Sequence, residues 1–235
     1  MTRHAIWKSI AENLTNDIVG GRYGPGDKLP TEAELSARFG VNRHTVRRAL
    51  SDMNDEGLVH SRRGAGVFVA MTPTDYPIGR RVRFHQNLRA AGRMPAKEIL
   101  TLETRKPDPR EAEALALRTG EEVHAFEGLS LADDQPIALF RSIFPAYRFP
   151  DLPAALRKHR SVTQALAEAG VDDYVRVSTR LAAKSATPVQ ALHLRLKAGA
   201  PILRAISLNA DQNGQPVEYG HTWFAGDRIT LTVEN

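Results

Sequence analysis

The segment at positions 29–50 restricts this chain most strongly, because it predicts two short helices joined by a very short turn. Thr31 and Glu34 have the spacing of a capping box, which starts a helix that Gly40 ends. Asn42 can cap a second helix almost immediately, since its side-chain oxygen accepts a backbone N–H. Two helices in such close succession predict a helix-turn-helix.

The second of these helices has two distinct faces. Its apolar stripe, at helical spacing, consists of Val46, Ala49, Leu50 and Met53. Arg43 and Arg47 lie one turn apart on another face, close to the helix start. A helix that packs by one face and presents arginines from its first turns has the form of a major-groove reader. Arginine suits this role because it can donate two hydrogen bonds to the O6 and N7 atoms of guanine.

A basic hairpin is expected to follow, with short strands at 58–60 and 67–69. Its tip contains Arg62, Arg63, Gly64 and Gly66, and an amphipathic helix at 4–20 precedes the whole unit. The unit therefore reads as a winged helix whose wing arginines can meet phosphates or the minor groove. Arg48 is expected to fix the register of the protein on phosphates.

Each of these features has a less specific interpretation. A single arginine on a helix is usually a solvated charge, a Gly-x-Gly sequence is usually a turn, and winged helices also dock onto proteins. The net charge of +5 permits nucleic-acid binding without establishing it. The ordered combination of cap, short turn, paired arginines and basic wing favours binding to double-stranded DNA.

The bulk composition restricts the class of protein. The 235 residues suffice for one large domain or two small ones, and they contain no cysteine and no long apolar run. We therefore expect a cytoplasmic protein without disulfides or thiolate metal sites. The eight histidines show no metal-ligand spacing, and the chain carries no Ser-x-x-Lys, His-Glu-x-x-His or nucleophile-elbow motif. We expect no cofactor, no metal and no catalytic residues.

The second half of the chain contains an approximate internal repeat. Residues 113–123 resemble residues 190–202, and each segment reads as a short helix, a glycine and a strand that enters a hairpin. Extended runs at 99–104 and 175–181 precede the two helices. Two strand-helix-strand-strand copies are expected to combine in one antiparallel sheet with helices on a face. A capped helix at 161–170 lies between them.

These patterns predict an α+β chain in two domains. The winged helix is expected at 1–71 and the sheet domain at 81–235. The linker is expected at 72–80, where two prolines interrupt any hydrophobic period.

The N-terminal motifs resemble the GntR family of bacterial transcription regulators. They are LPTEAEL at 29–35, FGVNRHTVRRAL at 39–50, GLV at 57–59 and GAGVFV at 64–69. The resemblance implies that Arg43, Thr45 and Arg47 touch bases or phosphates and that Gly64 enters the minor groove. Ala33 stands where some members carry a DNA-contacting arginine, and His44 can alter the sequence preference. The candidate DNA-contacting residues are Thr31, Arg43, His44, Thr45, Arg47, Arg48, Arg62, Arg63, Gly64 and Gly66.

The C-terminal half resembles the effector-sensing UTRA domain of the HutC subfamily, whose fold is similar to chorismate lyase. The motifs are ADDQP at 132–136, Ser161 before a helix, NGQPVE at 213–218 and GDR at 226–228. DYPI at 75–78 and RFHQNL at 83–88 add a closer resemblance to regulators of phosphonate utilisation.

The subfamily resemblance implies an effector site for a small anion. Backbone N–H groups at a helix start, near Phe84, are expected to hold it, as helix N-termini suit anions. Arg141 and His221 follow the prolines of their repeats by the same spacing, so they are expected to face a shared cleft. The candidate effector-binding residues are Arg83, Phe84, His85, Asn87, Arg141, Ser161, Glu218, Tyr219 and His221.

The effector class follows partly from what is missing. Sugar-phosphate sensors of the subfamily carry an Arg-x-Arg pair where this chain has Gly128 and Ser130. This departure weakens the assignment of a sugar phosphate and leaves room for a phosphonate, phosphate or small phospho-ester. A dimeric repressor that an anionic effector releases from an inverted-repeat operator is therefore our main hypothesis. The alternatives are a HutC-type regulator of another metabolite, such as a sugar phosphate or carboxylate, and an enzyme with a lyase-like C-terminal domain.

Overall fold

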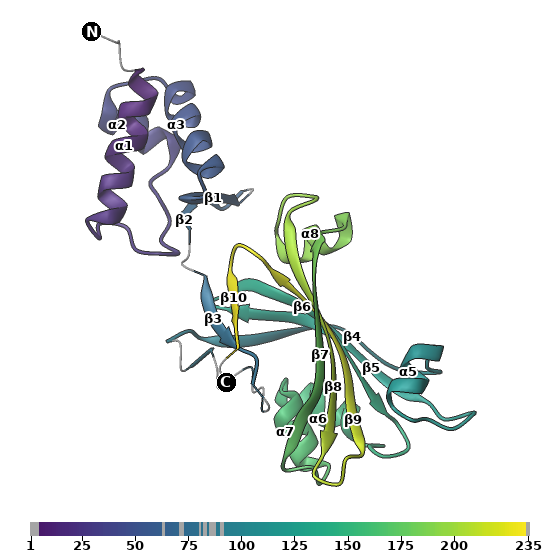
Figure 1. Cartoon of the computed structure of the whole chain (residues 1–235). Helices are drawn as coiled ribbons and strands as arrows, with labels where there is room; N and C mark the ends of the chain where they lie inside the picture. The colour runs from purple at the N-terminus through teal and green to yellow at the C-terminus, as the bar shows by residue number, and fades with distance from the viewer. Residues whose placement is uncertain are drawn as a thin grey trace. The chain divides into compact units, whose positions relative to one another are not determined.

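The computed structural model describes residues 5–62, 64–70, 73–79, 81, 84, 88–89 and 92–233. The chain divides into two compact units, Met1–Thr72 and Pro73–Asn235 (Figure 1). Across the described residues, no helix combines the length and the apolar character needed to cross a lipid bilayer.

The N-terminal unit is a winged helix, as the sequence predicts. Its elements are α1 (Ile6–Val19), α2 (Glu32–Phe39), α3 (Arg43–Asp55), β1 (Val59–Arg62) and β2 (Gly66–Val69). The Thr31 side chain accepts from the Glu34 backbone N–H while the Glu34 carboxylate accepts from the Thr31 N–H, which completes the capping box. Gly40 ends α2 in the left-handed region, with φ of 63°, where glycine carries no steric penalty. Asn42 Oδ1 then accepts from the Thr45 backbone N–H at 2.9 Å and caps α3.

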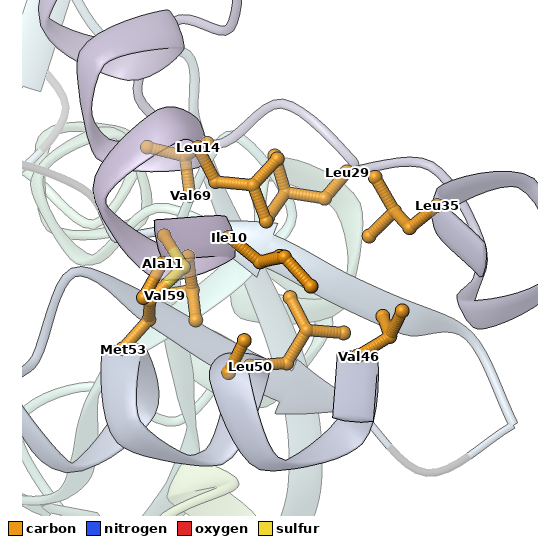
Figure 2. Packing of buried hydrophobic residues seen from close by; sticks show 11 residues of the cluster. Ile10, Ala11, Leu14, Leu29, Leu35, Val46, Leu50, Met53, Val59 and Val69 are labelled. Atoms are coloured by element: carbon orange, nitrogen blue, oxygen red, sulfur yellow. The ribbon is translucent and has the colours of Figure 1, made fainter. Parts of the chain in front are cut away.

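Side chains from all three helices meet in one hydrophobic core (Figure 2). Leu14 of α1, Leu35 of α2 and Val46 and Met53 of α3 are fully buried there. Removing each such side chain from water contributes about 1.5–3 kcal/mol. The core therefore holds α3 by one face and leaves its other face to solvent.

The C-terminal unit is built on a six-stranded antiparallel sheet in the order β4-β5-β6-β9-β8-β7. The strands are β4 (Pro95–Arg105), β5 (Val123–Ala132), β6 (Gln135–Pro145), β7 (Tyr174–Ser185), β8 (Pro201–Asp211) and β9 (Pro216–Ala225). Helix α5 (Pro109–Ala114) precedes β5, and α8 (Pro188–Leu194) precedes β8. The predicted repeat is thus present as β4-α5-β5-β6 and β7-α8-β8-β9, joined through β6 and β9.

The two faces of this sheet carry different elements. Helices α6 (Leu152–His159) and α7 (Val162–Glu168) pack on the face that includes Phe126 and Phe140. Toward the other end of that face lies a two-stranded ribbon of β3 (Thr74–Pro77) and β10 (Ile229–Thr232). Helices α5 and α8 pack on the opposite face. Figure 1 shows α6 and α7 side by side at one end of the sheet.

The ribbon corrects the predicted linker. Thr74–Pro77 lie within the expected linker at 72–80, yet they form β3 and pair in parallel with β10. Pro77 fits because it ends the strand, and the Ile78 backbone N–H continues the pairing by donating to Thr232. Burial alternates along β3: Thr74 and Tyr76 are buried, and Asp75 between them is exposed. This alternation is typical of a strand, but the two prolines in the segment led the sequence to be interpreted as a linker.

Arg228 of the GDR motif ties this region together. Its Nη1 donates to the carbonyl oxygens of Pro136 and Leu194 at 2.5 and 2.6 Å, and its Nη2 donates to the carbonyl of Arg195 at 3.1 Å. The side chain is 8% exposed. One guanidinium therefore satisfies the carbonyls at the C-terminal end of α8 and at the start of β6.

We predict that Arg228→Met lowers the unfolding free energy of the C-terminal unit by about 2–4 kcal/mol, because it leaves buried carbonyls without donors. Arg228→Lys should recover only part of this loss, since an ammonium cannot span all three acceptors. Urea unfolding followed by circular dichroism measures both variants. Arg180→Met, on the exposed part of β7, is the matched control, and an equal loss there would contradict the prediction.

Candidate functional site

The solvent-facing side of α3 begins with exposed polar residues. Arg43, His44 and Arg47 are exposed, whereas Val46 beside them is fully buried. Thr45 is committed to the cap, because its hydroxyl donates to Asn42 Oδ1 at 3.0 Å. The predicted reading face is therefore a capped helix start with exposed basic side chains.

Arg47 is held by a neighbouring carboxylate. Its Nε and Nη2 donate to the two oxygens of Glu32 at 2.9 and 2.7 Å, in a fork that joins α3 to the start of α2. The Arg47 guanidinium lowers the pKa of Glu32 through this hydrogen bond. The side chain is still 63% exposed, so Arg47 is oriented without being buried.

Arg48 points elsewhere. Its guanidinium lies 4.7 Å from the centre of the Trp7 ring of α1, at cation–π distance. Arg47 and Arg48, although adjacent in α3, therefore lie on different surfaces. Of the three α3 arginines, Arg43 and Arg47 share the face that the sequence predicts to contact bases.

The wing requires glycine at its tip. Gly64 has φ of 77° and Gly66 has φ of 118°, both in the region that favours glycine. A Cβ on Gly66 would lie 2.7 Å from Lys28 Cε, so the wing also packs closely on the chain before α2. Arg63 lies outside the described residues, and so does the side chain of Arg62. Of the expected effector residues, Arg83, His85 and Asn87 also lie outside them.

The C-terminal unit encloses a cavity of about 410 Å³. It lies on the sheet face that carries α6, α7 and the β3–β10 ribbon, and its lining includes residues at the start of α7 and in β3. Its described lining contains three cations, Arg89, Lys97 and Arg176, and one carboxylate, Glu218. The remaining polar lining includes hydroxyl and amide groups from Ser130, Ser142, Ser161, Thr163, Gln164, Tyr174, Ser207, Asn209 and Thr222.

Three of the expected effector residues line this cavity. Phe84 is half-buried beside Tyr76, with ring centres 6.3 Å apart. Ser161 is buried, and its hydroxyl oxygen accepts from the Gln164 backbone N–H at 3.4 Å as the cap of α7. Glu218 is also buried and projects from β9.

Arg141, Tyr219 and His221 do not line the cavity, which corrects the expectation of a shared cleft there. Arg141 and His221 are indeed register partners on β6 and β9. Successive strand residues point to opposite faces, however, and the cavity takes Phe140 and Ser142 on either side of Arg141. Arg141 instead pairs with Glu127 at 2.6 Å. Burial and the charges of Arg141 and Arg204 lower the pKa of His221.

Glu218 is fixed by neutral donors. Ser142 Oγ donates to its Oε1 at 2.6 Å, and Asn209 Nδ2 donates to its Oε2 at 2.8 Å. The amide of Asn209 is oriented by this bond, and its Oδ1 is buried without a hydrogen-bond partner among the described residues. The carboxylate is thus held in place with no cation against it in the described part of the unit.

Lys97 and Arg176 are site residues that the sequence analysis missed. Lys97 Nζ lies 3.8 Å from the centre of the Phe140 ring, and burial lowers its pKa to about 8. Arg176 has a buried Nε without a partner among the described residues, and burial lowers the pKa of its guanidinium too. Arg176 falls in the extended run expected at 175–181, which also contains Arg180, and Lys97 lies two residues before the run expected at 99–104. Only strand pairing shows which charge faces a cavity.

Comparison with known proteins agrees with this architecture. Residues 7–69 match the family described as bacterial regulatory proteins, gntR family, and residues 90–230 match the UTRA domain. The chain belongs to the GntR family of bacterial regulatory proteins. It is of the HutC type, in which a helix-turn-helix domain is joined to a UTRA domain.

Full-length relatives share both domains. An uncharacterized HTH-type transcriptional regulator, RB1450 of Rhizobium meliloti, is 38% identical over 98% of this chain and 95% of its own. The protein described as "probable transcriptional regulator PhnF" of Escherichia coli is 32% identical over 97% of this chain and 95% of its own. The crystal structure of PhnF from Mycobacterium smegmatis, 24% identical, superimposes with a TM-score of 0.66 over 96% of this chain and 98% of its own, so it supports the fold. This HutC-type chain is a transcriptional regulator.

We predict that Lys97 of the ligand-free regulator titrates near 8, because its ammonium is desolvated without a carboxylate partner, whereas surface lysines titrate near ~10.4. NMR of ¹³C-dimethylated lysines over a pH series measures this, with the signal assigned by its loss in Lys97→Arg. A Lys97 signal that titrates together with those of the surface lysines would contradict the burial that we describe.

Proposed function

We propose that this regulator is a dimeric repressor that binds an inverted-repeat operator and is released by a small anionic effector. The effector class is a phosphonate, phosphate or phospho-ester. The observation that carries the effector part is the cavity in the UTRA domain, where Lys97 and Arg176 lack anionic partners among the described residues. An anion in this cavity would compensate the desolvation of both cations.

The DNA-binding part rests on the surface of α3. Arg43 and Arg47 would supply base contacts from the helix start, and each well-formed pair with a base discriminates by about 1–3 kcal/mol. Arg48 and the wing would mainly contact phosphates, which sets register without reading sequence. Two such units in a dimer would fit half-sites related by two-fold symmetry.

Packing around Gly128 supports an effector other than a sugar phosphate. A Cβ on Gly128 would lie 2.3 Å from the Glu98 carbonyl oxygen and 2.8 Å from Phe140 Cζ. No side chain fits at this position without moving β4 or the Phe140 ring. Two of the three described cations of the cavity, Lys97 and Arg176, come instead from β4 and β7, the two edges of the sheet.

Release requires that the effector distinguish two states of the regulator. An effector that favours the non-operator state 100-fold contributes about 2.7 kcal/mol of coupling. The direct experiment measures thermal stabilisation by methylphosphonate, phosphate, sugar phosphates and urocanate, followed by electrophoretic shift of promoter DNA with the ligands that stabilise. The proposal expects a phosphonate or phosphate to stabilise the protein and to lower operator affinity. It fails if only a sugar phosphate or a carboxylate does so.

We predict that Arg47→Ala weakens binding to operator DNA more than binding to random DNA, because a base contact carries sequence information and a phosphate contact does not. Fluorescence anisotropy with both duplexes, at one salt concentration, measures the two affinities. Equal losses on the two duplexes would remove Arg47 from base reading.

We further predict that Arg48→Ala lowers both affinities by a similar factor, because its guanidinium lies over Trp7 and away from the reading face. This variant is the matched control, since it removes the same charge from the neighbouring position of α3. A selective loss of operator binding in Arg48→Ala would reverse the roles that we assign to these two arginines.

A further inference from the structure

A row of polar side chains crosses the cavity face of the sheet. Arg176 on β7 is the register partner of Asn209 on β8, and Asn209 is the register partner of Glu218 on β9. All three line the cavity. The row therefore presents a guanidinium, an amide and a carboxylate in order across three neighbouring strands.

The carboxylate end of this row has no cation against it among the described residues. Glu218 is 9% exposed, and in the described chain its two oxygens accept from the neutral groups of Ser142 and Asn209. Beside it, Asn209 Oδ1 is a buried acceptor without a partner in the described chain. A buried carboxylate next to an unused acceptor is costly unless a positively charged donor reaches both.

The two edge strands, β7 and β4, each place a cation in the cavity without an anionic partner among the described residues. Arg176 has a buried Nε donor without a described partner, and Lys97 Nζ lies over the Phe140 ring instead of against a carboxylate. The charge of Glu218 raises the pKa of both cations, but less than burial lowers it. Among the described residues, no ion pair joins either cation to Glu218, and the three side chains belong to β4, β7 and β9.

The cavity thus contains opposite charges that are not joined in an ion pair among the described residues. Building on the proposed anionic effector, we infer that the effector is a zwitterion, with an anionic head at Lys97 and Arg176 and an ammonium group at Glu218 and Asn209. The chemical class is an aminoalkyl phosphonate or the phosphate ester of an amino alcohol. A cavity of about 410 Å³ has room for such a molecule with some bound water.

The test compares two ligands that differ in one group. Isothermal titration at neutral pH measures the affinities of aminoethylphosphonate and ethylphosphonate for the full-length protein. We expect the amine to increase affinity by about tenfold or more, because it would complete the hydrogen bonds of a desolvated carboxylate. Equal affinity for the two ligands would overturn the zwitterion inference and leave the anionic effector in place. No binding of either would overturn both.

Variants then assign the two ends of the ligand. Glu218→Gln keeps the size and both neighbours of the side chain but removes its charge, so the preference for the amine should disappear while ethylphosphonate affinity stays equal or rises. Lys97→Met and Arg176→Gln should each weaken both ligands by a similar factor and preserve their ratio. Arg180→Gln, an exposed cation on β7, is the matched control and should change neither affinity.

These outcomes distinguish ammonium binding by Glu218 from a purely structural role of its side chain. A variant that had merely loosened the fold would lose affinity for both ligands and would unfold at a lower temperature, which circular dichroism detects. If Glu218→Gln retained the full preference for the amine, the ammonium position would be wrong. That conclusion holds even where the variant is slightly less stable, because the comparison is a ratio within one protein.

Discussion

The pairing of β6 with β9 is the interaction on which the C-terminal unit depends. It joins the two β-α-β-β copies into one sheet, and its register sets Ser142 beside Gly220, two residues after Glu218 on the same face of β9. The hydrogen bond from Ser142 to Glu218 therefore crosses the boundary between the copies. The sequence repeat and the cavity thus have one physical origin, because a cleft lined by both copies exists only when this pair of strands forms.

Local signals in the sequence sufficed for the winged helix. The caps at Thr31 and Asn42 and the glycine at Gly40 act through neighbouring residues, so spacing alone predicts them. The Arg47–Glu32 pair could not be predicted this way, since it joins residues 15 positions apart through the angle between two helices. The same limit applies to β3, whose partner β10 lies near the other end of the chain.

The cavity was predictable only in part, for a reason that strand geometry makes clear. Sequence spacing correctly paired Arg141 with His221, yet it could not tell which face of the sheet they occupy. One position along a strand reverses the face, so Glu218 lies in the cavity while Tyr219 does not. Lys97 and Arg176 stand on the two edge strands, with four strands between them, and only the order in which all six strands pair brings both to one cavity.

Under the proposed function, the wall of the cavity would connect a bound effector to the winged-helix unit through the chain itself. Tyr76 of β3 and Ile78, just after β3, line it, and β3 begins soon after the N-terminal unit ends. Thr74, at the start of that strand, is held by the Arg93 side chain and by the backbone of Arg228. A ligand that contacted Tyr76 would therefore act on β3, whose N-terminal end follows directly from the winged-helix unit. Coupling would require two conformational states that differ in the placement of β3 and bind the effector with different affinity. A ligand shifts such an equilibrium by its difference in affinity between the states.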